Sequence, residues 1–279
     1  MDQAILVASF GTTHDDTCEK NIASLERAVA AAFPDAQVYR AFTSTMVRAA
    51  LARRGKPVGG VDETLERIAA SGCRKLTVLP THLLYGVEYD DLCRRVDAHA
   101  DLFDEVCLAA PLLADVADYR RVLQTLFEEN PLQEYEALVL MGHGTSHVCN
   151  PVYAALDYEA KAMGLARVFI GTVEAYPSLD DTVVQVLKAG FKRVLITPLM
   201  LVAGDHAVND MASDEPGSWK TTFEEAGIET RCLVKGLGEY PAVRALYVEH
   251  VADAIPLDRG SANHRADDDA RDSLPSERV

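Results

Sequence analysis

The sequence predicts an α/β fold with two similar lobes, each built on a mainly parallel β-sheet flanked by helices. Short apolar runs alternate along the chain with longer amphipathic stretches, an order that is typical of α/β proteins. Most apolar runs are continuous, as expected for strands that are covered on both faces. The two halves of the chain also share one pattern, which predicts that each half folds in the same way.

The apolar runs place the strands, and the amphipathic stretches place helices between them. Strands are expected at residues 4–10, 37–42, 75–84, 105–113, 137–142, 167–173, 193–202 and 230–235. Helices are expected at residues 17–32, 61–70, 89–103, 116–129, 151–163, 179–189, 219–226 and 242–254. Local chemistry supports several boundaries. Asn150 and Pro151 form a favourable helix start, and Gly72 and Gly190 follow helical stretches, where a left-handed cap is common.

The internal repeat is clearest in two segments that each begin with glycine and end with proline. Residues 72–80 align with residues 190–198 at a constant offset of 118. At the same offset Glu88 corresponds to His206, and the repeat predicts that both lie at equivalent places in the two lobes. The halves meet near Asn130, where a proline follows the fourth predicted helix, at residues 116–129.

This repeat divides the chain into an N-terminal α/β lobe at residues 1–130 and a C-terminal α/β lobe at residues 131–257. A charged tail is expected at residues 258–279. The tail contains six acidic and four basic residues and few large aliphatic ones. Such a segment buries too little apolar surface to offset the entropy lost on ordering, so it is expected to be mobile.

The composition excludes several classes of protein. The chain has 279 residues, 27 Lys and Arg against 43 Asp and Glu, and a formal net charge of −16. This charge repels phosphate backbones and anionic lipids, so nucleic acid and membrane surfaces are not expected partners. No apolar run approaches the length of a membrane span. The six cysteines show no CxxC spacing, which fits buried thiols in a cytoplasmic protein.

Three segments that follow predicted strands in the second half carry the residues best suited to chemistry. His143 lies between two glycines, Glu174 follows an apolar run, and His206 follows a break at Gly204. The carboxyl ends of parallel strands meet at one edge of a sheet, where ligands bind. Two imidazoles and a carboxylate suit a first-row divalent metal. We therefore predict a metal site at His143, Glu174 and His206, with the two histidines also accepting protons.

Each of these residues also has a simpler explanation. His143 fits a loop histidine with a hydrogen-bonded ring, and Glu174 fits a solvated turn residue. Asp205 and His206 fit the start of a capped helix that continues through Asp210. The coincidence of all three segments at the ends of neighbouring strands favours the metal site.

The first half supplies weaker candidates for the wall of the same cleft. Glu88 occupies the position equivalent to His206, and Phe10 lies in the segment that corresponds loosely to the one around His143. His82 belongs to the same stretch as Glu88. We predict Glu88, Phe10 and His82 as candidates that line a substrate cleft.

The remaining histidines carry less weight. His14 and His147 each follow a Gly-Thr turn and are expected near the mouth of the cleft. His99, His250 and His264 are expected on helix faces or in the tail.

These segments resemble the anaerobic sirohydrochlorin cobaltochelatases, the class II, early-insertion cobalt chelatases of cobalamin biosynthesis with a ferrochelatase-like fold. The GHGT, VEAYP and AGDHAxND motifs are specific to that family and stand here in the same order. The resemblance covers about residues 4–255, and it is carried by residues 6–13, 79–89, 141–145, 174–177 and 198–206.

The resemblance implies two α/β lobes that hold a tetrapyrrole between them and an enzyme that inserts Co²⁺ into sirohydrochlorin. No organic cofactor is implied. The family's metal-binding and proton-accepting residues match His143, Glu174 and His206. A substrate of this kind carries several carboxylates, which a strongly negative protein must neutralise locally. Candidates for that role, or for a solvated helix face, are Arg48, Arg53, Arg54 and Lys56.

Several alternatives stay open at this point. A sirohydrochlorin ferrochelatase that inserts Fe²⁺ uses the same chemistry, and a non-catalytic carrier of tetrapyrrole or metal suits the same two-lobed shape. A hydrolase or mutase that uses His143 is disfavoured because the chain has no nucleophile motif and no phosphate loop. A homo-oligomer is also open, because nothing in the sequence determines the oligomeric state.

Overall fold

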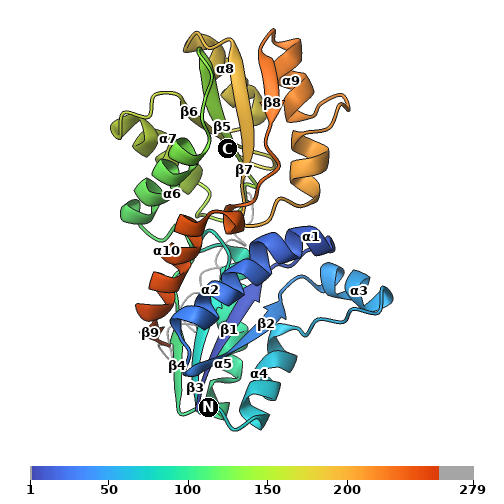
Figure 1. Ribbon diagram of the computed structural model, residues 1–279, viewed down its shortest axis with the longest axis vertical. Helices are drawn as coiled ribbons and strands as arrows, with labels where there is room; N and C mark the ends of the chain where they lie inside the picture. The colour runs from blue at the N-terminus through green and yellow to red at the C-terminus, as the bar shows by residue number, and fades with distance from the viewer. Residues whose placement is uncertain (1, 258–279) are drawn as a thin grey trace, which may run out of the picture.

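Two parallel sheets organise the chain into a lower and an upper lobe in the view of Figure 1. The computed structural model describes residues 2–257. The tail expected at residues 258–279, which includes His264, lies outside the described residues. None of the described helices is long and apolar enough to cross a bilayer.

The first sheet has the strand order β2-β1-β3-β4-β9, and the second has the order β6-β5-β7-β8. Bounds in the first sheet are β1 Gln3–Ser9, β2 Ala36–Phe42, β3 Lys75–Pro80, β4 Glu105–Leu108 and β9 Ile255–Pro256. Bounds in the second are β5 Glu136–Gly142, β6 Val168–Thr172, β7 Arg193–Leu199 and β8 Glu229–Cys232. All pairs are parallel except β9 with β4.

The two sheets share one topology. In each sheet the first strand along the chain lies between the second and the third, and the fourth lies beside the third, as β2-β1-β3-β4 and β6-β5-β7-β8 show. This shared topology confirms the predicted fold class of two similar, mainly parallel lobes. Each predicted strand is present, but β3, β4 and β7 end earlier than the apolar runs do. The extra apolar residues belong to buried loops, such as the one that contains Leu112 and Leu113.

Helices cover both faces of each sheet. On the first lobe they are α1 Asp15–Thr17, η1 Cys18–Ala23, α2 Ser24–Ala32, α3 Thr45–Arg53, α4 Val61–Ala70, α5 Val87–Ala98 and η2 Ala100–Leu102. On the second lobe they are α7 Val152–Ala162, α8 Leu179–Lys188, η3 His206–Met211, α9 Trp219–Glu225 and η4 Leu237–Glu239. Helix α3, strand β9 and the 3₁₀ turn η4 have no counterpart among the predicted elements.

Two long helices cross between the lobes (Figure 1). Helix α6 (Val116–Glu129) follows the first sheet but packs against α7, whereas α10 (Pro241–Ala252) follows the second sheet but packs against α2 and β3. The chain then adds β9 to the edge of the first sheet. Residues 241–256, which the predicted boundaries 131–257 assign to the second lobe, therefore pack against the first lobe. The division of the chain at residue 130 stays a prediction.

The exchange of helices gives the lobes a common core. One cluster of buried side chains contains Ile5 and Val7 from the first sheet together with Leu138 and Leu140 from the second. Two further clusters lie under the outer helices of each lobe. The inner cluster therefore joins the two lobes through shared apolar packing.

Contacts between α6 and α10 reinforce the junction. His250 Nε2 on α10 lies 3.2 Å from Asp118 Oδ1 on α6, and both side chains are almost buried. Arg121 on α6 also forms two hydrogen bonds with Glu249 on α10. Burial lowers the pKa of His250, but the hydrogen bond and charge of Asp118 outweigh it and raise that pKa above its usual value.

Candidate metal centre

The second sheet delivers three chemically active residues to one edge. Its central strand β5 ends at Gly142, which pairs with Thr172 of β6 and Leu199 of β7. The three strands therefore end at the same level, and the segments that follow them leave the sheet side by side. These segments carry His143, Glu174 and, after a longer loop, His206.

His143, Glu174 and His206 converge in the structure. Each offers one ligand atom that lies within 4.8 Å of the other two. Nδ1 of His143 is 3.7 Å from Oε2 of Glu174, and the two imidazole rings meet edge to face with centroids 4.7 Å apart. Their side chains are 43%, 56% and 37% exposed, so an ion can reach them from solvent. The structure thus brings together the three residues that the sequence singled out.

Glycines on both sides of His143 are required by close packing. A Cβ on Gly142 would lie 2.3 Å from the Tyr153 ring, and a Cβ on Gly144 would lie 2.9 Å from the Ala175 nitrogen. Gly144 also has a φ of +84°, which glycine adopts readily. Because the backbone N–H of Glu174 donates to the His143 carbonyl at 2.9 Å, the two residues are held together.

Hydrogen bonds to the ring nitrogens determine which atoms remain available. Nδ1 of His143 lies 2.8 Å from the carbonyl oxygen of Gly144. A carbonyl only accepts hydrogen bonds, so neutral His143 carries its proton on Nδ1 and presents the lone pair of Nε2. His206 is arranged in the same way, with its Nδ1 beside the carboxylate of Asp210. Both rings can therefore use Nε2 to bind a cation or to accept a proton.

The three first-half candidates lie outside this cluster. Phe10 follows β1 with half of its surface exposed, and Glu88 is exposed in the first turn of α5. Both ring nitrogens of His82 are buried without a hydrogen-bond partner in the described part of the chain. Burial lowers the pKa of His82 to about 4, so this ring is neutral near pH 7. A role for these residues in a substrate cleft stays a prediction.

Two histidines outside the predicted site connect the lobes. His14, which follows β1, places Nε2 2.9 Å from Oδ1 of Asp205 in the second lobe. His147, which follows β5, places Nε2 3.4 Å from Oδ2 of Asp90 in the first lobe. The segments after β1, β5 and β7 and the first turn of α5, which follows β3, therefore meet, and the carboxyl ends of the two sheets face each other.

Several exposed apolar side chains follow the parallel strands of both sheets. They share a position in the first loop or helical turn after a parallel strand, and they are Phe10, Met46, Tyr85, Val87, Val148, Tyr176 and Val208. Of these side chains, only Phe10 is among the residues predicted from the sequence to line a substrate cleft. Exposed apolar groups that gather around two facing edges suit a ligand with large apolar faces.

The basic cluster predicted after the second strand is mostly engaged within the first lobe. Arg54 donates to the carbonyl of Thr13 at 2.8 Å, and Lys56 pairs with Asp15. Arg48 lies 3.7 Å from Glu63. Arg54 and Lys56 thus hold the loop after β1 in place. A role in binding substrate carboxylates stays a prediction for this cluster.

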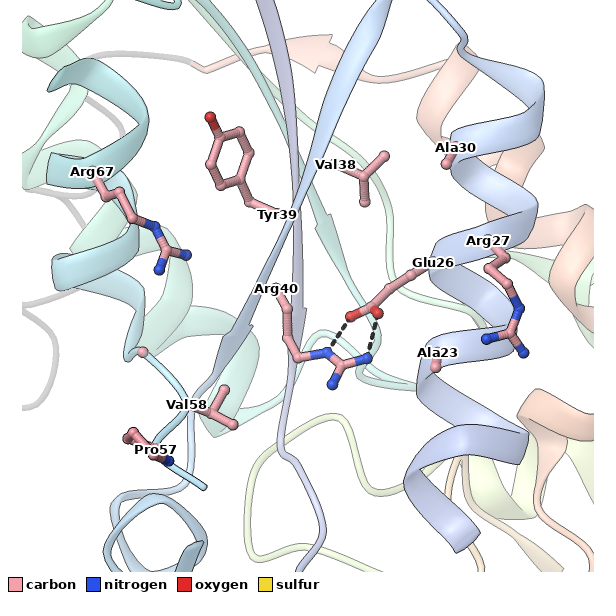
Figure 2. A pocket seen from close by; sticks show the side chains of 11 residues that line it. Ala23, Glu26, Arg27, Ala30, Val38, Tyr39, Arg40, Pro57, Val58 and Arg67 are labelled. Carbon is pink, nitrogen blue, oxygen red and sulfur yellow. Dashed lines mark hydrogen bonds and ion pairs between the residues drawn. The ribbon is translucent and has the colours of Figure 1, made fainter. Parts of the chain in front are cut away.

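A separate hollow lies on the first lobe beside the edge strand β2 (Figure 2). Arg40 and Glu26 form a two-pronged ion pair across it, with Nε 2.7 Å from Oε1. Arg67 lies over the ring of Tyr39. None of the residues predicted for the metal site lines this hollow, and its central arginine is already neutralised by the protein.

The sequence matches the model of the cobalt chelatase (CbiK) family over residues 3–256. It is 43% identical over 260 residues to the sirohydrochlorin cobaltochelatase of Salmonella typhimurium. The alignment covers 92% of this chain and 98% of that protein. It is 32% identical over 257 residues to the sirohydrochlorin cobaltochelatase CbiKC of Nitratidesulfovibrio vulgaris. The alignment covers 91% of this chain and 90% of that protein.

Solved chelatase structures share the fold at low sequence identity. SirB from Bacillus subtilis with Fe³⁺ superposes with a TM-score of 0.62 at 15% identity, over 91% of this chain and 95% of that one. CbiX, described as the terminal enzyme of sirohaem biosynthesis in denitrifying bacteria, superposes with a TM-score of 0.53 at 18% identity. The superposition covers 91% of this chain and 99% of that one. Fold and relatives together place the chain among the chelatases. Within that class, it belongs to the cobalt chelatase family.

Proposed function

We propose that this protein inserts Co²⁺ into sirohydrochlorin, a precorrin-2-type tetrapyrrole, in anaerobic cobalamin biosynthesis. The observation that carries the proposal is the convergence of His143, Glu174 and His206 where the two lobes face each other. The proposal is supported by two relatives named as sirohydrochlorin cobaltochelatases, each of which aligns over most of its length. The reaction exchanges two pyrrole N–H protons for one Co²⁺.

The metal reaches the ring through the cluster. His143, Glu174 and His206 replace water molecules around the ion one at a time, which divides the cost of dehydration into smaller steps. The carboxylate of Glu174 offsets part of the positive charge, and the imidazoles suit a first-row ion. The set contains no thiolate, so the protein releases the ion to the four pyrrole nitrogens more readily than a thiolate site would.

Proton transfer accompanies the transfer of metal. Each pyrrole N–H that loses its proton gains a bond to the metal through the same nitrogen. We assign His143 as the principal proton acceptor, because its Nε2 lone pair is free in the neutral ring, and His206 as an assisting base. General base catalysis of this kind contributes about 10²–10⁴-fold to a rate.

The tetrapyrrole has two apolar faces, and the cleft offers apolar side chains from both lobes. Phe10 and Tyr176 are half exposed or more, and each follows a strand of a different lobe. We propose that such side chains cover the ring, with Glu88 and His82 contributing to the first-lobe wall. Water is then displaced from the ring, which strengthens the electrostatic interactions at the metal.

We propose cobalt as the metal because the two relatives are named as cobaltochelatases. By the Irving–Williams order a set of imidazoles and carboxylate does not itself prefer Co²⁺ over Ni²⁺ or Cu²⁺, so selectivity comes from geometry and supply. The solved structures include SirB of Bacillus subtilis both with Fe³⁺ and with cobalt. Insertion of Fe²⁺ is therefore the alternative reaction that the experiment must compare.

We also propose the cytoplasm as the place of the reaction. The six cysteines are scattered along the chain without CxxC spacing, which fits thiols in a reducing compartment.

The test is an anaerobic assay of purified protein with sirohydrochlorin and either Co²⁺ or Fe²⁺, followed by absorbance. We expect multiple turnovers in the wild type and large losses in His143→Ala and His206→Ala. His99→Ala is the matched control, because its ring is bonded to the Arg95 carbonyl on the far end of α5. Turnover limited to one equivalent would favour a carrier. A faster rate with Fe²⁺ at limiting substrate would favour a ferrochelatase.

A further inference from the structure

The carboxylate of Asp210, four residues after His206, determines which ring nitrogen of His206 carries the proton. Nδ1 of His206 lies 2.5 Å from Oδ2 of Asp210 within the π-helical turn η3. The two side chains are 37% and 46% exposed, so the pair lies at the surface of the cleft and not in the core. An ionised carboxylate only accepts hydrogen bonds, so this contact requires the proton of neutral His206 on Nδ1.

The two histidines of the cluster have different partners at Nδ1. His143 donates to a neutral backbone carbonyl, that of Gly144, whereas His206 donates to the negative carboxylate of Asp210. Both arrangements leave Nε2 unprotonated, but a carboxylate pushes more electron density into the ring. Histidines that ligate metals are commonly held in this way, and the carboxylate strengthens the ring as a ligand. The geometry therefore makes His206 the stronger electron donor of the two.

We propose that Asp210 is a positioning residue that keeps His206 on the metal after His143 has released it, so that His143 can then serve as the principal proton acceptor. The proposal rests on the chelatase function proposed above and assigns separate tasks to the two rings. Co²⁺ stays bound to Nε2 of His206 while Nε2 of His143 takes one pyrrole proton at a time and passes it to water. After two such transfers, both displaced protons are in solvent and Co²⁺ is bound to the ring nitrogens.

Ring orientation gives Asp210 a second effect. The His143 and His206 rings meet at an interplanar angle of 88° with centroids 4.7 Å apart. Rotation of either ring about its χ2 angle would change the distance between Nε2 and a shared ion. The bond to Asp210 restrains the His206 ring, so its loss would cost affinity through disorder as well as through charge.

Asp210→Asn tests the proposal with little change in shape. The amide can present its NH₂ group to Nδ1 and so permit the tautomer with the proton on Nε2, whose Nε2 then has no lone pair for the metal. We expect calorimetry with Co²⁺ alone to show an affinity about 10–100-fold weaker than in the wild type, the usual cost of losing such a partner. In turnover, the KM for Co²⁺ should rise by a similar factor while kcat at saturating Co²⁺ is retained.

Asp214→Asn is the matched control, because it removes the same charge three residues after the end of η3. Asp214 is 88% exposed and pairs with Lys220 instead of a cluster residue. Its variant should bind Co²⁺ as the wild type does. Asp210→Glu keeps the carboxylate and should recover part of the affinity that Asp210→Asn loses.

A measurement on the wild type makes the proposal independent of any variant's folding. Long-range ¹H–¹⁵N spectra of ¹⁵N-histidine-labelled protein should show His206 protonated on Nδ1 and bare on Nε2. Protonation on Nε2, or an unchanged Co²⁺ affinity in Asp210→Asn, would overturn the proposal. Loss of affinity in Asp210→Asn without any turnover in the wild type would refute the chelatase function and leave the role of Asp210 standing.

Discussion

His14 and Asp205 join the two lobes beside the metal cluster, with Nε2 of the histidine 2.9 Å from Oδ1 of the aspartate. Asp205 immediately precedes His206 in the chain, so this contact ties a proposed metal ligand to the opposite lobe. A second histidine–aspartate pair also connects the lobes: His147 follows a strand of the second lobe, and Asp90 lies in the first turn of α5 on the first lobe. Two histidine–aspartate pairs thus connect the lobes, each with its histidine on a different lobe.

We expect His14→Ala to weaken binding of the tetrapyrrole more than the chemical step. The pair is largely exposed, with side chains 50% and 76% accessible, and solvent screens such pairs strongly. Exposed ion pairs are worth about 0–1 kcal/mol, so the KM for tetrapyrrole should rise no more than about fivefold. Steady-state kinetics at saturating Co²⁺ would measure this. A large fall in kcat would instead mean that His14 acts in the chemistry.

Replacement of Gly144 by alanine should disrupt the metal cluster. Gly144 has a φ of +84°, and an added Cβ would lie 2.9 Å from the Ala175 nitrogen, next to Glu174. The left-handed backbone alone costs about 1–2 kcal/mol, and the clash would also move Glu174 away from His143. We expect Gly144→Ala to lose both stability and Co²⁺ affinity in denaturation and calorimetry experiments.

Gly164→Ala is the control for that prediction. Gly164 has a φ of +79°, but a Cβ there meets no other atom within 4 Å. Gly164→Ala should lose stability as Gly144→Ala does, but it should bind Co²⁺ as tightly as the wild type. Equal affinities in the two variants would show that packing around Gly144 does not position the cluster.

Glu174→Gln should weaken Co²⁺ binding while leaving the fold intact. The side chain is 56% exposed, so the substitution buries no unpaired group. Loss of the negative charge should reduce the affinity at least about tenfold, or about 1.4 kcal/mol. Calorimetry with Co²⁺ alone measures the change, and the exposed Glu225 on α9 supplies a control, Glu225→Gln. Affinity equal to that of the control would remove Glu174 from the ligand set.

The pair of His250 and Asp118 should make stability depend on pH. The pKa of folded His250 is raised, so the folded state binds this proton more tightly than the unfolded state does. The stabilisation is complete below the usual histidine pKa of about 6.5 and is lost as pH rises through the folded value.

Urea denaturation of the wild type and of His250→Gln across this pH range would test the linkage. The wild type should exceed the variant by about 1–3 kcal/mol at low pH, where the charged pair is intact, and by less at high pH. A difference that does not change with pH would show that His250 does not titrate in this range.

Much of the fold was predictable because apolar runs and helical stretches alternate regularly. The repeat at residues 72–80 and 190–198 correctly predicted equal topologies in the two lobes. The convergence of His143 with Glu174 followed from a general property of parallel sheets, whose carboxyl ends share one edge. Local sequence was sufficient there because each residue lies within two positions of a strand end.

Other features depend on tertiary contacts that no local pattern encodes. Helix α3 buries little more than Leu51 and carries basic residues, so its sequence resembles a loop. The predicted strand at residues 193–202 ran past Leu199 because the buried residues after it are apolar as well. The bond between His206 and Asp210 required the geometry of η3, which the sequence suggested only as a short helix.

The exchange of α6 and α10 also governs how the protein folds. Tyr247 on α10 is fully buried against the first lobe, where its hydroxyl donates to the Thr81 carbonyl at 2.8 Å. A ribosome must therefore complete the second lobe before the first can close its core. The two lobes should unfold in a single cooperative transition, and neither could be produced as an autonomous fragment by cutting the chain at Asn130.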